Sequence, residues 1–228
     1  AFSLVGTVDS GRESSSIPLP VSFQDLLCDL EVWPAELQRS LLEHLYELVT
    51  ESSEKRHNLN TMRDMQLVQR LLRVLPEVIS PPTRQVLLAL LGAVLAGQPL
   101  QQDLLAFGQF MTATLPSSAV SERDIVLQEC SPRSRQSSVE IAEVEAPPDT
   151  ANWILLRNRC LQLLHGLLFT PRNTVNNVFC EEVVSVLGMD WPLLYMQGHL
   201  HPSTVVWGLR LLVVLGSIPS LLAKFREG

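Results

Sequence analysis

The sequence predicts an all-α protein in which pairs of helices stack against one another. Short leucine-rich runs recur along the 228 residues, with apolar residues at the i, i+3, i+4 and i+7 positions of a helix that is buried on one face. Prolines and glycines separate these runs, and no segment alternates apolar and polar residues as a half-buried strand does. Because each run is too short to form a globule alone, we expect consecutive helices to bury leucine against their neighbours.

The composition limits the classes of partner. Hydrophobic residues make up 46% of the chain and charged residues 18%, which is typical of a folded, leucine-rich helical protein rather than a disordered one. The net charge of −7 argues against nucleic acid, and equally against an anionic membrane surface, because both need a basic face.

The cysteines indicate a reducing compartment. Cys28, Cys130, Cys160 and Cys180 lie far apart, and no CxxC motif occurs. Cys160 and Cys180 fall within helical patterns, so we expect them in the core, where a thiol behaves as a small apolar group. This usage favours a cytoplasmic protein.

The first part of the chain divides into an arm and a helical block. Residues 1–21 are rich in Ser, Gly and Pro and are expected to be a flexible arm, and residues 22–115 form the first block of helical repeats. After the apolar positions between Phe23 and Leu30, we expect further helices from Pro34 to Val49, over 59–65, over 67–75, over 83–96 and over 100–114.

The character of the chain changes over residues 116–149. This stretch has no sustained apolar stripe, and its acidic residues outnumber its basic ones. A structureless insertion of this length is unusual inside a compact domain. We therefore expect a long disordered Ser-rich, acidic loop between two helical blocks.

The second block covers residues 150–228, and we expect it to continue the same solenoid as residues 22–115. Its helices are expected from Leu155 to Leu168, from a cap at Asn173 or Thr174 to Leu187 with Gly188 as the stop, over 193–197, and from His201 onward.

The most apolar stretch of the chain, Val205–Ala223, contains Arg210 and Pro219. A membrane span needs about 20 uninterrupted apolar residues, so a buried helix followed by a break is expected instead. The chain has no initiator Met, which favours a segment of something longer. We expect such a fragment to self-associate through its last helix, Ser203–Phe225, because the ends of a cut solenoid expose apolar surface.

No motif indicates catalysis, a cofactor or a metal. The sequence contains no GxGxxG, P-loop, GxSxG, HExxH or calcium-loop pattern. His199 and His201 could supply two metal ligands, but Cys180 and Asp190, the nearest Cys and acid in sequence, satisfy no ligand spacing. We therefore expect a turn with one histidine capping a helix and the other exposed.

Three serines are candidate phosphorylation sites. Ser131 precedes a proline, as proline-directed kinases require, while Ser138 and Ser15 each follow an arginine by three residues, as basophilic kinases prefer. A phosphate adds nearly two negative charges and could dock the loop on an arginine-bearing face. The alternative is a solvated linker without modification.

Two distant segments share a short sequence pattern. Asn60-Thr61-Met62, followed by Met65–Leu72, is echoed by Asn176-Asn177-Val178, followed by Glu182–Leu187. An asparagine, an apolar residue two positions on and a nearby Val-x-x-Leu resemble the core of an armadillo-type repeat. The resemblance implies an armadillo/HEAT-like α-solenoid.

A second resemblance covers the stretch from Asn173 to Gly228. Its residues Leu187–Leu194, Met196–Pro202, Thr204–Arg210 and Phe225–Gly228 are similar to the helical region of BEACH-family proteins of the WD-repeat-and-FYVE branch. This branch has an autophagy-linked member and an immune-cell member, and the Leu- and Ser-rich character favours the latter. None of the family's hallmark modules lies in this segment. The lipid binding of those modules is therefore assigned to no residue of this chain.

The resemblance implies a non-enzymatic scaffold segment of a large cytoplasmic protein. Such proteins act in vesicle trafficking, selective autophagy or antigen processing, and associate with endosomal or autophagic membranes through other domains. The partners expected here are other proteins and the remainder of the same long chain, with no nucleic acid and no direct membrane insertion. The alternative is a purely structural spacer that positions distant PH-BEACH and WD-repeat modules.

Overall fold

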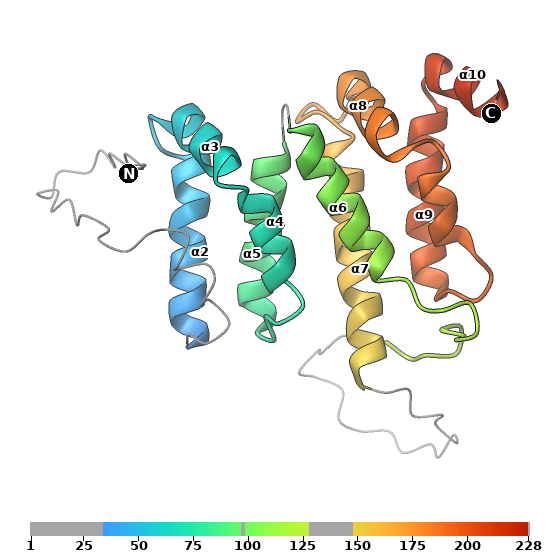
Figure 1. Ribbon diagram of the computed structural model, residues 1–228, viewed down its shortest axis with the longest axis horizontal. Coiled ribbons are helices and arrows are strands. Elements are labelled where there is room, and N and C mark those ends of the chain that lie inside the picture. Colours follow the sequence, from blue (N-terminus) through green and yellow to red (C-terminus); the bar gives the residue numbers. More distant parts are fainter. Residues whose placement is uncertain (1–33, 97–98, 128–147, 228) are drawn as a thin grey trace, which may run out of the picture. The chain divides into compact units, whose positions relative to one another are not determined.

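The structure, a computed structural model, describes residues 34–96, 99–127 and 148–227. In these ranges the regular structure is helical, apart from one isolated antiparallel bridge between Phe169 and Val175 (Figure 1). The predicted all-α fold class is confirmed. The chain divides into two compact units, the first comprising residues up to Phe110 with Gly166–Gly188, and the second Met111–His165 with Met189–Gly228.

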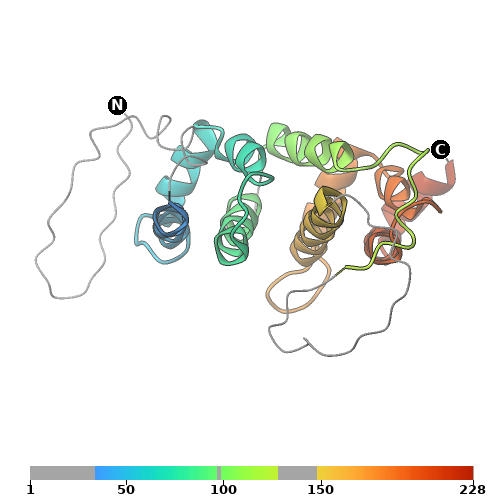
Figure 2. The same ribbon diagram turned by 90° about the horizontal axis from the view of Figure 1, so that it is seen from below.

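The first unit is built from stacked helices. Its helices are α2 (Ala35–Thr50), α3 (Lys55–Asp64), α4 (Leu67–Val74), α5 (Pro81–Leu95), most of α6 (Gln101–Ala113) and α8 (Asn177–Leu187). Helix α2 packs along α5, and α3 and α4 also contact α5. Seen from below, α3, α4 and α6 lie along one side of α2 and α5 (Figure 2). Consecutive helices therefore bury their faces against near neighbours, as in an α-solenoid.

Leucine fills the seam of this unit, as the helical spacing predicts. Leu42 and Leu45 of α2 are buried, and so are Leu87, Leu90 and Leu91 of α5. The apolar stripe of α2 is not buried along its whole length, because Leu37 near the start of the helix is 50% exposed.

Two helices of the first unit begin earlier than predicted. Helix α3 starts at Lys55 rather than at residue 59, and α5 starts at Pro81 rather than at residue 83. A proline has no N–H to lose in the first turn, so α5 can begin on its own proline pair.

The predicted cap of α8 is wrong by a few residues. Asn176 caps this helix, and its side-chain oxygen accepts a hydrogen bond from the backbone N–H of Phe179 at 3.2 Å. Asn173 instead adopts a left-handed φ of 58° in the preceding turn. Gly188 ends the helix with a φ of 87°, which confirms the predicted stop.

The second unit contains α7 (Pro148–Leu167) as far as His165, the 3₁₀ helix η2 (Trp191–Met196), α9 (Pro202–Gly216) and α10 (Pro219–Glu227). The helix predicted over 193–197 is thus a 3₁₀ turn that starts two residues earlier. Helix α9 packs against η2 at Gly208, where a Cβ atom would lie 3.0 Å from Cβ of Tyr195 and 3.3 Å from the carbonyl oxygen of Pro192.

The predicted break in the apolar C-terminal stretch is confirmed. Helix α9 ends at Gly216, α10 begins at Pro219, and the two meet at a bend of 108°. Of the helices in the described ranges, none alone has the length and apolar character of a membrane span, and only this bent pair reaches them together, by length and composition alone.

The segment 116–127 forms no helix, but it is not loose. The sequence predicts disorder over 116–149, whereas the structure buries Glu122 almost completely. The rest of the predicted loop as far as residue 147, the arm over 1–21, and both Cys28 and Cys130 lie outside the described residues.

Candidate functional site

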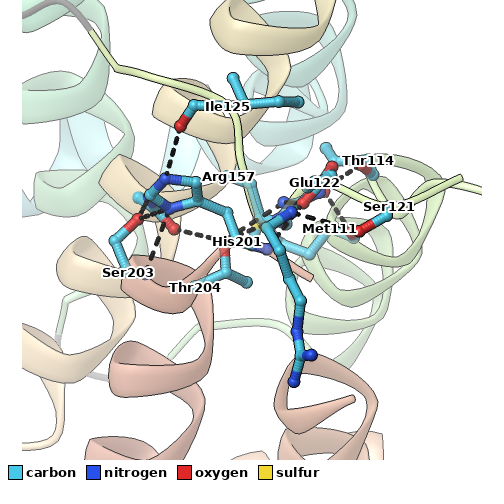
Figure 3. A network of polar contacts seen from close by, with 11 residues as sticks. Met111, Thr114, Ser121, Glu122, Ile125, Arg157, His201, Ser203 and Thr204 are labelled. Carbon is cyan, nitrogen blue, oxygen red and sulfur yellow. Dashed lines mark hydrogen bonds and ion pairs between the residues drawn. The ribbon is translucent and has the colours of Figure 1, made fainter. Parts of the chain in front are cut away.

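Arg157 is the most buried charged side chain in the described part of the second unit. It lies on α7 with no exposed surface, at the start of the polar triplet Arg157-Asn158-Arg159. Its Nη1 donates to the carbonyl oxygen of Thr114 at 2.8 Å, and its Nη2 donates to a carboxylate oxygen of Glu122. Nε and Nη2 also donate to the hydroxyl of Thr204, at 3.3 and 3.2 Å. Figure 3 shows these contacts converging on the guanidinium.

Glu122 links this arginine to the start of α9. Its Oε2 accepts from the backbone N–H of His201 at 3.2 Å, and its own N–H donates to the carbonyl of His199 at 2.8 Å. The carboxylate therefore has both a cationic partner and a backbone donor. Segment 116–127 is held in place by this residue.

His201 caps α9, as the sequence predicts. Its Nδ1 accepts from the backbone N–H of Ser203 at 3.2 Å, and its Nε2 lies 3.2 Å from the carbonyl oxygen of Ile125. Because a carbonyl can only accept, this geometry assigns the proton to Nε2 and leaves Nδ1 as the acceptor. His199, predicted to be exposed, is half-buried.

A second pair of contacts ties α7 to α9. The amide nitrogen of Asn158 donates to the hydroxyl of Ser203 at 2.6 Å, and the hydroxyl of Thr204 donates to the amide oxygen of Asn158 at 2.8 Å. We define Thr114, Glu122, Arg157, Asn158, His201, Ser203 and Thr204 as the Arg157 network. Its polar groups largely satisfy one another, so the network holds segment 116–127, α7 and the start of α9 together.

The described part of the chain contains no group of three or more His, Cys, Asp or Glu side chains that could hold a metal ion. Of the metal pair considered from sequence, His201 contacts the carbonyl of Ile125 with its imidazole, and His199 accepts from the N–H of Glu122 with its backbone carbonyl.

A smaller polar cluster lies in the first unit. Asp103 of α6 is buried, and its Oδ1 accepts from Nε2 of Gln69 at 3.0 Å. Burial raises the pKa of Asp103, and Oδ2 has no hydrogen-bond partner among the described residues. Nearby Arg63 donates to the carbonyls of Val94 and Ala96 at 3.0 and 3.2 Å, closing the end of α5, and burial lowers its pKa.

Both predicted core cysteines are buried thiols. Cys160 and Cys180 have no exposed surface and form no disulfide. Burial raises the pKa of Cys180 to about 11, so this residue is a thiol rather than a reactive thiolate at neutral pH.

The candidate docking site is an open apolar groove where α9 meets α10, with a volume of about 370 Å³. Its lining consists of Met189, Leu212, Val213, Gly216, Ser217, Leu222 and Phe225. Val213 is 62% exposed and Phe225 is 38% exposed. Leu209 and Val206, four and seven residues before Val213, are exposed by nearly half and extend the apolar surface along α9.

Positively charged side chains lie on the same two helices as this apolar surface. Arg210 of α9 lies over the ring of Trp207 at 4.5 Å, and Lys224 and Arg226 are exposed in the last turn of α10. The sequence from Trp191 to Arg226 contains no Asp or Glu, although the whole chain carries a net charge of −7. We call the groove lining, Val206, Leu209 and these three cations the α9–α10 elbow.

The sequence pattern predicted the break between α9 and α10 and the cap at His201, but not the burial of Arg157 and Glu122. Arg157 stands beside the polar residues Asn158 and Arg159, and nothing local marks it as buried. The candidate phosphorylation sites Ser15, Ser131 and Ser138 lie outside the described residues and stay predictions.

The chain is similar along its whole length to known proteins. It is 33% identical over 231 aligned residues to WD repeat- and FYVE domain-containing protein 4 from Homo sapiens, and 34% identical to the Mus musculus protein of that name. Both alignments cover 100% of this chain and 7% of the relative. Protein SPIRRIG from Arabidopsis thaliana is 26% identical over 208 residues, which cover 89% of this chain and 5% of that protein.

These similarities confirm the resemblance that the sequence motifs indicated. The chain spans about 7% of the length of the first two relatives. No family model matches it, and no solved structure matches it.

Proposed function

Because the chain is related along its whole length to one segment of the WD-repeat-and-FYVE branch of the BEACH family, we propose that it is a non-enzymatic scaffold segment. In this proposal it belongs to a large cytoplasmic protein that acts in vesicle trafficking, selective autophagy or antigen processing. Its contribution is a helical-repeat surface to which other proteins bind.

The observation that carries this proposal is the apolar surface of the α9–α10 elbow. Val206, Leu209 and Val213 are each between 47% and 62% exposed on one helix, beside a groove with an apolar lining. Contiguous exposed apolar surface next to charged residues is typical of a protein interaction site.

The test uses the full-length protein in cells, with a proximity-labelling enzyme fused to it. Val213→Asp is compared with Ile79→Asp, because Ile79 is an exposed apolar residue of the first unit, at 86% exposure. We expect Val213→Asp to remove a defined set of labelled proteins while Ile79→Asp retains them. If neither these variants nor deletion of the segment alters the labelled set, the scaffold proposal fails.

The alternative function is a structural spacer between distant modules. The Arg157 network favours it, because a braced helical unit keeps a fixed length. Replacement of the segment by an unrelated helical repeat of equal length separates the two functions. If the protein with the replaced segment keeps its full cellular activity, the spacer function is supported. If that activity is lost while the protein remains normally abundant, the interaction surface is supported.

A further inference from the structure

We propose that the α9–α10 elbow is a docking groove for an amphipathic helix of a partner protein that carries acidic residues beside its apolar stripe. This inference rests on the proposed scaffold function and narrows it to one surface and one class of partner.

The shape of the elbow suits a helix. The bend of 108° between α9 and α10 leaves a hollow with Val213 and Phe225 in its lining. Along α9 the exposed apolar residues follow the spacing i, i+3 and i+7, at Val206, Leu209 and Val213. Helices that bind in grooves present anchors at the same spacing, so a partner helix can pack its stripe along this one.

The charge of the elbow selects an acidic partner. Arg210, Lys224 and Arg226 are its cations, and the stretch between the flanking acids Asp190 and Glu227 contains no Asp or Glu. Arg210 is held over the ring of Trp207, so its guanidinium loses little freedom when a carboxylate binds to it. The stretch from Lys55 to Arg73 also carries an excess of cations, so the preference of the elbow for an acidic partner rests on the position of its three cations beside the apolar groove.

An anionic membrane would also attract cations, but the geometry favours a helix. Residues that insert into a bilayer protrude from an amphipathic surface. Here Val213 and Phe225 line a hollow, and Phe225 is only 38% exposed. A membrane is therefore treated as a competing outcome of the test.

The experiment measures binding of fluorescent peptides to this purified chain by anisotropy. The probes are two matched pools of helical peptides about 16 residues long, a length at which isolated helices begin to form. Both pools have apolar residues at i, i+3 and i+7; one pool has Glu and the other Lys at the flanking positions. We expect saturable binding of the Glu pool and at least about tenfold weaker binding of the Lys pool, equivalent to about 1.4 kcal/mol.

Variants of the chain locate the binding site. Val213→Asp is expected to weaken binding of the Glu pool at least about tenfold, while Ile79→Asp leaves it within about twofold. Because Val213 is 62% exposed, its replacement leaves the core intact, which circular dichroism checks. The double variant Arg210→Glu with Lys224→Glu is expected to invert the preference between the two pools.

Each of four results would overturn the proposal. The first is no binding of the Glu pool, and the second is equal binding of both pools. The third is a dimer in sedimentation that Val213→Asp dissociates, which would identify a second copy of this chain as the occupant. The fourth is binding to phosphatidylserine vesicles that Val213→Asp abolishes while peptide binding is absent, which would identify a membrane.

Failure of this inference is distinct from failure of the scaffold function. If peptides do not bind but deletion of the segment still removes labelled partners from the full-length protein, only the elbow is wrong. If deletion changes no partner, the scaffold function itself is wrong.

Discussion

Glu122 and Arg157 form an ion pair in which the two side chains are 2% and 0% exposed, although one lies in an irregular segment and the other on α7. Each charge has additional hydrogen bonds, from the N–H of His201 and to the carbonyl of Thr114. Removing either side chain of such a buried pair strongly destabilises the protein, because the remaining charge is left buried without compensation.

Arg157→Met is expected to lower the free energy of unfolding by about 3–5 kcal/mol, the usual cost of leaving one partner of a buried pair. Urea denaturation followed by circular dichroism measures this change. Arg159→Met is the control on the same helix, where the side chain is exposed, and is expected to change stability by no more than about 0.5 kcal/mol.

The double variant Glu122→Gln with Arg157→Met is expected to lose less stability than the sum of the two single variants, because contacting residues are not additive. The double-mutant cycle in urea measures the coupling energy directly. Strict additivity of the two losses would contradict the ion pair.

His201→Ala is expected to lower the free energy of unfolding by about 1 kcal/mol, because it removes the cap from the start of α9. His201→Asn provides a residue that caps well but cannot reach both Ser203 and Ile125, so it should recover part of the loss. Thermal denaturation of both variants tests this order, and equal stability of the Ala variant and the parent protein would refute the cap.

Asp103→Asn is expected to stabilise the protein at neutral pH and to reduce the pH dependence of its stability. Burial raises the pKa of Asp103 in the folded state above its ordinary value of 3.8. Protonation of Asp103 therefore favours folding. The stability that the protonated side chain contributes is fully present below pH 3.8 and is lost as the pH rises through the higher pKa of the folded state. Urea titrations from acid to neutral pH on both proteins measure the difference, and parallel curves would contradict it.

Gly208→Ala and Gly216→Ala are expected to have opposite effects, although both glycines lie on α9. A Cβ at position 208 meets Tyr195 and Met196 at 3.0 and 3.1 Å, so α9 must move away from η2. A Cβ at position 216 meets no atom within 4 Å, so alanine fits at this last residue of α9 and should add stability, by less than the roughly 0.5–1 kcal/mol of a mid-helix position. Differential scanning calorimetry should show a lower melting temperature for the first variant and a higher one for the second.

Cys180 is expected to resist alkylation by iodoacetamide at pH 8 in the folded protein and to react fully in urea. Its pKa of about 11 leaves little thiolate at that pH, and its side chain is inaccessible. Mass spectrometry of the peptide containing Cys180 measures the modified fraction. Rapid labelling under native conditions would show that this helix opens.

Local patterns predicted the parts of the fold that local physics determines. The proline after His201 and the glycine at position 188 marked a helix start and a helix stop, because caps depend on a few adjacent residues. Helical spacing likewise predicted the buried leucines of α2 and α5. The cap of α8 was harder, since Asn173 and Asn176 carry the same capping chemistry, and only the turn that contains Asn173 decides between them.

Local sequence patterns did not predict the Arg157 network. Arg157 and Glu122 are 35 residues apart, and the glutamate lies in a stretch whose composition predicts disorder. Nothing near either residue distinguishes a buried charge from a surface one. The elbow was predicted only in part: Pro219 marked the break, but the exposure of Val213 depends on packing between helices.

The wide separation of the partners of Glu122 has a consequence for biosynthesis. Its carboxylate receives a hydrogen bond from the N–H of His201, which lies 79 positions later in the chain. At a translation rate of roughly 5–20 residues per second, several seconds therefore pass between the appearance of Glu122 and that of its donor His201. The second unit can close only after the start of α9 has left the ribosome, and until then the carboxylate of Glu122 lacks this backbone donor.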